Sequence, residues 1–211
     1  MHWVYYFGRI IIHIIVFPIA SWQVKGRENV PAQGPLLIVC NHLHLADPPI
    51  VAASIKLKAV FMAKEELFRH RWSRFWVQNF GAFPVRRRGA DREALRQAER
   101  WLKQGVSLIM FPEGSRSRQS QMQPALPGAA LIASRMGVPI LPVGITGTEK
   151  IKGPACWLHR PRITVNIGPP FRLPPAAGKP TRAELDQLTD SIMGQVAGLL
   201  PPEYRGVYAR D

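Results

Sequence analysis

Residues 36–49 read LLIVCNHLHLADPP and carry the local signals of a strand, a polar turn and a helix. The first five are apolar and follow Gly34-Pro35, which predicts a short strand buried on both faces. Strands of this kind belong to parallel or mixed sheets that are covered by helices. Asp47 precedes two prolines and an apolar run, so it is predicted to cap the next helix. We therefore expect an α/β fold.

The polar turn after this strand is a candidate catalytic site. In open α/β sheets, ligands bind beyond the carboxyl ends of the strands, which is where His42 and Asp47 would lie. His42 is the candidate base. In the alternative interpretation, His42 is a solvated turn residue and Asp47 is only a helix cap. A short motif such as this one does not choose between the two.

Composition places the chain among globular proteins with an anionic partner. It has 211 residues, and 28 Lys and Arg against 14 Asp and Glu give a net charge of +14. That length suits one domain with a sizeable core. The charge indicates nucleic acid, an acidic membrane surface or a phosphorylated substrate. Cys40 and Cys156, the two cysteines, form neither a disulfide framework nor a metal site, which favours a reducing compartment.

The first two dozen residues have a composition of their own. Residues 3–22 read WVYYFGRIIIHIIVFPIASW, in which Arg9 and His13 interrupt the apolar run, and aromatic residues lie near both ends. A charge inside a membrane span is costly, whereas aromatic side chains concentrate at the membrane interface. We expect residues 1–24 to associate with the membrane and residues 25–211 to form the folded domain. A core helix docked on the domain is the alternative; a signal peptide would need a small-x-small cleavage site.

Further along, apolar strands alternate with helices, which predicts a single domain with a mixed, mostly parallel sheet flanked by helices. Residues 23–35 read as a polar, turn-rich lead-in. Residues 64–79 are predicted to form a helix with one aromatic and one basic face, either a core helix or a surface that faces membrane or substrate. The other expected strands are 59–63, 106–111, 138–145 and 162–167, and the other expected helices are 48–54, 91–105, 128–136 and 181–199.

Two further polar segments follow apolar stretches, of which residues 80–85 read as a strand or a loop and residues 106–111 as a strand. Three arginines stand at 86–88, and the turn 112–118 reads PEGSRSR at the same end of a strand as His42. A base, an arginine that can clamp an anion and a donor-rich turn are the parts needed to transfer an acyl group to the hydroxyl of a phosphorylated acceptor.

The chain resembles the glycerolipid acyltransferases related to 1-acylglycerol-3-phosphate acyltransferase. Four blocks of that family occur in order: Asn41-His42 with Asp47, Gly81 with Phe83 and Arg87, Phe111-Pro112-Glu113-Gly114-Ser115-Arg116-Ser117, and Val138-Pro139-Ile140-Leu141-Pro142-Val143. The resemblance implies that His42 takes the proton of the acceptor hydroxyl, with Asp47 holding the imidazole in the right tautomer.

The resemblance also assigns the substrate-binding residues. It implies that Arg87 and Arg116 bind the acceptor phosphate, and that Glu113, Gly114 and Ser115 shape the third turn. Glu113 has a second possible role as an ion-pair partner that fixes Arg87 or Arg116, and the sequence leaves both open.

The implied reaction moves a fatty acyl chain from acyl-CoA or an acyl carrier protein to 1-acylglycerol-3-phosphate and gives phosphatidic acid at the cytoplasmic face of a membrane. Another lysophospholipid acceptor is the alternative. No cofactor, metal or covalent intermediate is expected, since Cys40 in an apolar strand reads as an inert small hydrophobe. A basic nucleic-acid-binding module is the rival from another class; the apolar N-terminus and the lack of a nucleic-acid motif disfavour it, so no nucleic-acid partner is expected.

Overall fold

The fold is built on one seven-stranded sheet with the strand order β1-β7-β6-β2-β5-β3-β4. The computed structural model describes residues 20–55, 57–79, 81–86, 91–151, 159–174, 178 and 180–209. Neighbouring strands run parallel, except that β6 and β7 are antiparallel, which confirms the mixed, mostly parallel sheet. The strands are β1 (Ser21–Lys25), β2 (Leu37–Cys40), β3 (Ala59–Lys64), β4 (Ala82–Val85), β5 (Ser107–Met110), β6 (Ile140–Thr146) and β7 (Arg162–Ile167).

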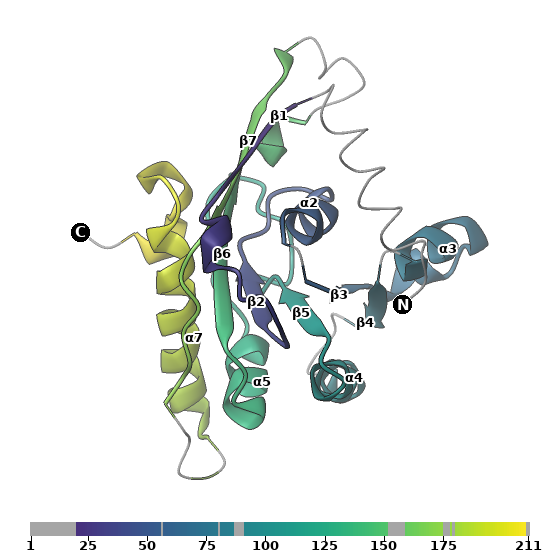
Figure 1. Cartoon of the computed structure of the whole chain (residues 1–211), viewed down its shortest axis with the longest axis vertical. Coiled ribbons are helices and arrows are strands. Elements are labelled where there is room, and N and C mark those ends of the chain that lie inside the picture. Colours follow the sequence, from purple (N-terminus) through teal and green to yellow (C-terminus); the bar gives the residue numbers. More distant parts are fainter. Residues whose placement is uncertain are drawn as a thin grey trace.

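Helices cover both faces of this sheet (Figure 1). On one face, α4 (Arg92–Lys103), α5 (Gly128–Met136) and α7 (Arg182–Gly198) pack on an apolar cluster. On the other face, α2 (Asp47–Ser54) packs on a second cluster, and α3 (Arg71–Asn79) stands beyond β4. Short 3-10 helices complete the described chain: η1 (Arg27–Asn29), η2 (Glu65–Phe68), η3 (Thr148–Lys150), η4 (Pro202–Tyr204) and η5 (Gly206–Tyr208).

Side-chain caps begin two of the helices. The Asp91 side chain accepts a hydrogen bond from the backbone N–H of Ala94 at the start of α4. At the start of α7, Thr181 and Glu184 form a reciprocal capping box. Both caps satisfy backbone donors that the first turn of a helix leaves without partners.

Two expected elements differ from the structure. Residues 23–35 are predicted as a polar, turn-rich lead-in, yet Ser21–Lys25 form β1, which pairs with β7 at the edge of the sheet. Its pairing partner lies some 140 residues away, so local patterning carries little of the signal. The helix expected over residues 64–79 divides into η2 and α3, with β3 extending to Lys64.

The expected membrane-associating segment, residues 1–24, overlaps β1 at Ser21–Val24. Residues 1–19, which hold most of it, lie outside the described residues. Within the described ranges, no helix is both long and apolar enough to cross a bilayer.

Candidate active site

The candidate site lies where two neighbouring parallel strands end. Val39 of β2 is in register with Met110 of β5, so the turns after these strands meet at one edge of the sheet. The backbone N–H of His42 donates to Glu113 Oε1 over 2.9 Å, and the backbone N–H of Ser117 donates to the carbonyl of His42 over 2.8 Å. The first and third sequence blocks are thus joined through the backbone of His42.

Asp47 organises the turn that contains His42. The residue is fully buried, and its Oδ2 accepts from His42 Nδ1 at 2.8 Å, from the Leu43 N–H at 2.6 Å and from the His44 N–H at 2.7 Å. The prediction that Asp47 caps α2 is wrong, because Ala46 holds the cap position and Asp47 is the first helical residue. Its carboxylate turns back instead and accepts from the Leu43 and His44 N–H groups of the preceding turn, for which the described part of the chain shows no other acceptor.

The imidazole of His42 is held in one tautomer. Nδ1 donates to Asp47, which leaves the lone pair on Nε2, and in the described part of the chain Nε2 has no hydrogen-bond partner. The ring stacks at a tilt against Phe111, with 4.4 Å between ring centroids and 33° between planes. His42 therefore has the orientation of a residue that accepts a proton through Nε2.

Asn41 fastens the turn to the next strand. Its amide nitrogen donates to the Ile145 carbonyl over 2.9 Å, and its amide oxygen accepts from the Ile145 N–H over 2.8 Å. These two bonds continue the pairing of β2 with β6 beyond Cys40, where the regular ladder ends. The residue before His42 is thereby fixed to the centre of the sheet.

Glu113 connects the His42 turn to the loop that follows the third block. Its Oε1 accepts from His42, and its Oε2 accepts from the backbone N–H of Gln123 over 3.0 Å. Burial raises the pKa of Glu113 from 4.5 to about 7, although both hydrogen bonds favour the charged form. Within the described residues both carboxylate oxygens contact backbone amides, and neither pairs with Arg116. The ion-pair role with Arg116 is therefore not seen.

An open cavity of about 1010 Å³ lies beside this turn. Ser115 and Arg116 line it together with Arg118 and Leu43, the residue next to His42. Gly114 turns the chain into this wall with φ +68, a conformation that favours glycine. The rest of the lining comes from the loop after the third block and from the C-terminal segment: Ser117, Gln119, Gln121, Met122, Gln123, Pro124, Pro202, Gly206, Val207 and Ala209.

The stretch of sequence that contains this site matches a known family. The model of the family described as Acyltransferase matches residues 21–146, which is more than half of the chain. The chain belongs to the acyltransferase family. The match covers β1 to β6 and so contains all four blocks and both turns of the site.

Relatives of this acyltransferase agree with the family assignment. A 1-acyl-sn-glycerol-3-phosphate acyltransferase of Streptococcus pneumoniae is 31% identical over 193 residues, covering 87% of this chain and 67% of the relative. One from Bacillus subtilis is 26% identical over 178 residues, covering 84% and 87%. The crystal structure of the 1-acyl-sn-glycerophosphate (LPA) acyltransferase PlsC from Thermotoga maritima superposes with a TM-score of 0.69 at 27% identity, covering 93% of this chain and 76% of that one.

Of the predicted site residues of the acyltransferase, the structure brings His42, Asp47 and Glu113 into direct contact and places Ser115 and Arg116 on the cavity wall. Arg87 lies outside the described residues. Cys40 is fully buried in β2, and burial raises the pKa of its thiol, which disfavours a thiolate. No group of three or more metal-ligating side chains gathers anywhere in the described ranges.

Sequence reasoning missed several residues around the site. Phe111 was placed in a strand and in the third block without a role of its own, although an aromatic residue before the third turn could have pointed to a ring beside His42. Gln123 was not predicted because its contribution is a backbone N–H. The C-terminal segment was also missed: Tyr208 accepts from the Ala125 N–H through its hydroxyl oxygen, and the Met122 N–H donates to the Tyr204 carbonyl. No local pattern signals these contacts.

Proposed function

We propose that this acyltransferase moves a fatty acyl chain from acyl-CoA or an acyl carrier protein to the free hydroxyl of 1-acylglycerol-3-phosphate, which gives phosphatidic acid for phospholipid biosynthesis. The observation that carries the proposal is the 2.8 Å hydrogen bond from His42 Nδ1 to Asp47, because it leaves Nε2 as the basic atom. The names of the relatives support the acceptor.

In the proposed reaction His42 is the general base. Nε2 takes the hydroxyl proton as the acceptor oxygen attacks the thioester carbonyl, and Asp47 stabilises the imidazolium that forms. The tetrahedral intermediate then expels the thiolate, which receives the proton from Nε2 and leaves as a thiol. The products are an ester and a thiol, and no acyl-enzyme is needed. Glu113 positions His42 through its backbone N–H.

Arg116 and Arg87 are proposed to bind the acceptor phosphate. A guanidinium meets a phosphate through two parallel charge-assisted hydrogen bonds. Arg116 lines the cavity beside the His42 turn, which supports this role. Ser115 lies on the same wall, and Gly114 precedes it with φ +68. Arg87 is proposed on the family resemblance alone.

The enzyme is proposed to work on the cytoplasmic face of a membrane, where its lipid acceptor resides. The apolar composition of residues 3–22 and the net charge of +14 support attraction to an anionic lipid surface, without a nucleic-acid partner. A different lysophospholipid acceptor is the second candidate. The openness of the cavity, whose wall combines polar and apolar side chains, favours it as a competitor, since such a wall can admit several head groups.

The decisive experiment offers the purified enzyme one labelled acyl-CoA and a panel of lysophospholipids and glycerol phosphates. The proposal expects the highest kcat/KM with 1-acylglycerol-3-phosphate. His42→Ala should lower kcat about 10²- to 10⁴-fold with every acceptor while the fold is kept. Near-wild-type turnover by this variant would remove His42 from the mechanism. If the enzyme prefers an acceptor without a phosphate monoester, 1-acylglycerol-3-phosphate is not its substrate.

Arg116→Lys separates phosphate binding from general charge. The variant keeps the positive charge but loses the bidentate geometry, so it should raise the acceptor KM about tenfold and leave the donor KM unchanged. Arg118→Lys, on the same cavity wall, is the matched control. A raised donor KM instead would assign the Arg116 contact to the phosphates of CoA.

A further inference from the structure

The outer face of α3 carries two large aromatic side chains with high exposure. Trp72 is 78% exposed and Phe75 is 54% exposed. Residues three apart lie on the same face of a helix, so the two rings form one patch. The inner side of this region packs on the domain: Phe68 of η2 and Val77 of α3 contact the apolar cluster under α2. The helix is thus fixed to the domain and presents a second apolar face outward.

Basic side chains surround this patch. Arg71 and Arg74 are exposed on α3, and Arg69 and His70 precede it. From Leu67 to Ala90 the sequence contains no acidic residue. The nearest acids upstream already have partners: Glu65 pairs with Arg86 at 3.2 Å, and Glu66 pairs with Lys64 at 3.1 Å. The surface therefore combines exposed aromatic rings with arginines that form no ion pair within the described ranges.

The position of α3 relates this surface to the active site. β3 runs parallel to β5, as β2 does, so all three strands end at the same edge of the sheet. η2 and α3 follow β3 at that edge (Figure 1). The turn with His42 follows β2 at the same edge, because β2 and β3 both run parallel to β5. A ligand that docks on α3 would thus approach the molecule from the side on which acyl transfer is proposed.

We propose that the aromatic and basic face of α3, formed by Arg71, Trp72, Arg74 and Phe75, docks the enzyme onto an anionic lipid bilayer. Aromatic side chains favour the interface between head groups and acyl chains, and arginines are attracted to anionic head groups. The charge complementarity selects a bilayer over a second copy of this chain, which would bring two strongly basic surfaces together. The inference rests on the proposed function in placing the substrate in the bilayer.

Vesicle co-sedimentation of the full chain tests the docking. Wild-type protein should bind vesicles of phosphatidylcholine mixed with phosphatidylglycerol more tightly than phosphatidylcholine alone. Arg71→Gln with Arg74→Gln should weaken binding to the anionic vesicles about thirtyfold. Trp72→Ser with Phe75→Ser should weaken binding to both kinds of vesicle about tenfold. These side chains are exposed, so their substitution should leave the core intact. Thermal unfolding checks the fold of each variant.

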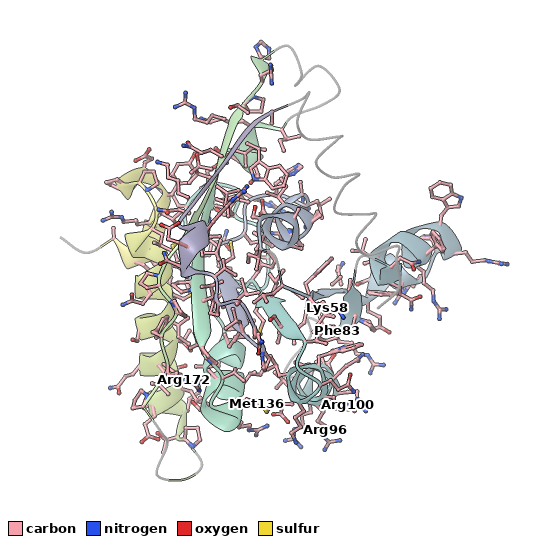
Figure 2. The ribbon with its side chains drawn as sticks, viewed as in Figure 1. Lys58, Phe83, Arg96, Arg100, Met136 and Arg172 are labelled. Carbon is pink, nitrogen blue, oxygen red and sulfur yellow. The ribbon has the colours of Figure 1, made fainter. Side chains whose placement is uncertain are left out.

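A matched control removes two charges elsewhere. Arg96 and Lys103 are exposed on α4, where Arg96 projects away from the sheet (Figure 2). Arg96→Gln with Lys103→Gln lowers the net charge by the same two units. It should keep vesicle binding within about threefold of wild type, because binding depends on charges at the bilayer surface. An equal loss in the control and the α3 variant would show that only net charge matters and would overturn the proposal.

Activity distinguishes this inference from the proposed function. With a short-chain acceptor dissolved as monomers, the α3 variants should turn over like wild type; with the acceptor embedded in anionic vesicles, they should be slower. If wild type acylates neither acceptor, the proposed function fails while the docking result stands. Unchanged vesicle binding by both α3 variants overturns the docking. The docking is also overturned if Trp72→Ser with Phe75→Ser leaves vesicle binding unchanged and lowers only the thermal stability, because the rings would then pack on the chain itself. If the variant loses only self-association, the rings contact a second copy of the chain, and the docking is overturned as well.

Discussion

At the scale of single residues, the site depends on buried carboxylates that hold backbone amides. Asp47 accepts from two N–H groups as well as from His42, and Glu113 accepts from two more. Charged acceptors make stronger hydrogen bonds than neutral ones, so these residues fix the path of both turns. The cost of burying them appears in the raised pKa of Glu113.

That raised pKa predicts a pH-dependent loss of stability. Between its ordinary pKa of 4.5 and its folded pKa of about 7, Glu113 keeps a proton in the native state that the unfolded chain has released. The native state binds more protons, so the free energy of unfolding falls as the pH rises through this window, by about 3 kcal/mol in total.

Glu113→Gln should remove this dependence. Denaturant unfolding of both proteins at about pH 4 and about pH 8 measures it, and wild type should lose about 3 kcal/mol relative to the variant as the pH rises. Groups other than Glu113 titrate equally in both proteins and cancel in the difference. If the free energy of unfolding changes with pH by the same amount in both proteins, burial does not raise the pKa of Glu113.

At the scale of elements, the C-terminal segment is part of the site. Gly206 has φ +51, and an added Cβ would lie 2.2 Å from the carbonyl oxygen of Met122, in the loop that Glu113 holds. Gly206→Ala should therefore displace this loop, destabilise the fold and raise the substrate KM several-fold. Steady-state kinetics with thermal unfolding measures both effects.

The matched control is Gly137→Ala. Gly137 has a similar φ of +58 after α5, and nothing lies within 4 Å of an added Cβ. Its substitution should cost only the left-handed backbone strain, about 1–2 kcal/mol, and leave KM unchanged. Equal effects of the two substitutions on KM would show that the C-terminal segment does not shape the cavity.

The sequence predicted the elements whose signals are local. β2 and β5 are short apolar runs, whereas α4 and α7 have apolar residues at helical spacing and a capping residue at their start. The structure confirms all four elements. β1 was missed because pairing with β7, rather than its own pattern, makes it a strand. The local pattern around Asp47 wrongly predicted a helix cap, because a local pattern does not show which way a carboxylate turns, whereas the family resemblance implied its contact with His42. The backbone donors of Leu43 and Gln123 have no side-chain signature at all.

At the scale of the whole molecule, the boundary of the folded domain can be tested by truncation. Removing residues 1–19 leaves β1 complete, whereas removing residues 1–22 also deletes Ser21 and Trp22 and their pairing with β7. The shorter truncation should keep the stability of wild type and bind vesicles less. The longer one should also unfold at lower denaturant concentration, because Trp22 packs against the apolar cluster under α2.

Co-sedimentation and urea unfolding of both truncated proteins provide the measurement. If removal of residues 1–19 alone destabilises the domain as much as the longer truncation, the apolar segment is a docked core helix. The membrane-associating role of that segment would then be withdrawn, while the docking of α3 would be judged on its own variants.

The links that fasten the His42 turn span long stretches of sequence. Its partners are Glu113, 71 residues downstream of His42, and Ile145, 104 residues downstream of Asn41. His42 and Asp47 are synthesised early, yet the framework that aligns them does not exist until β6 has been made. On the ribosome, the chain therefore emerges with its reactive residues first and their supports last. A messenger RNA truncated before the codon for residue 145 yields a protein that contains His42 and Asp47 but lacks the framework that aligns them.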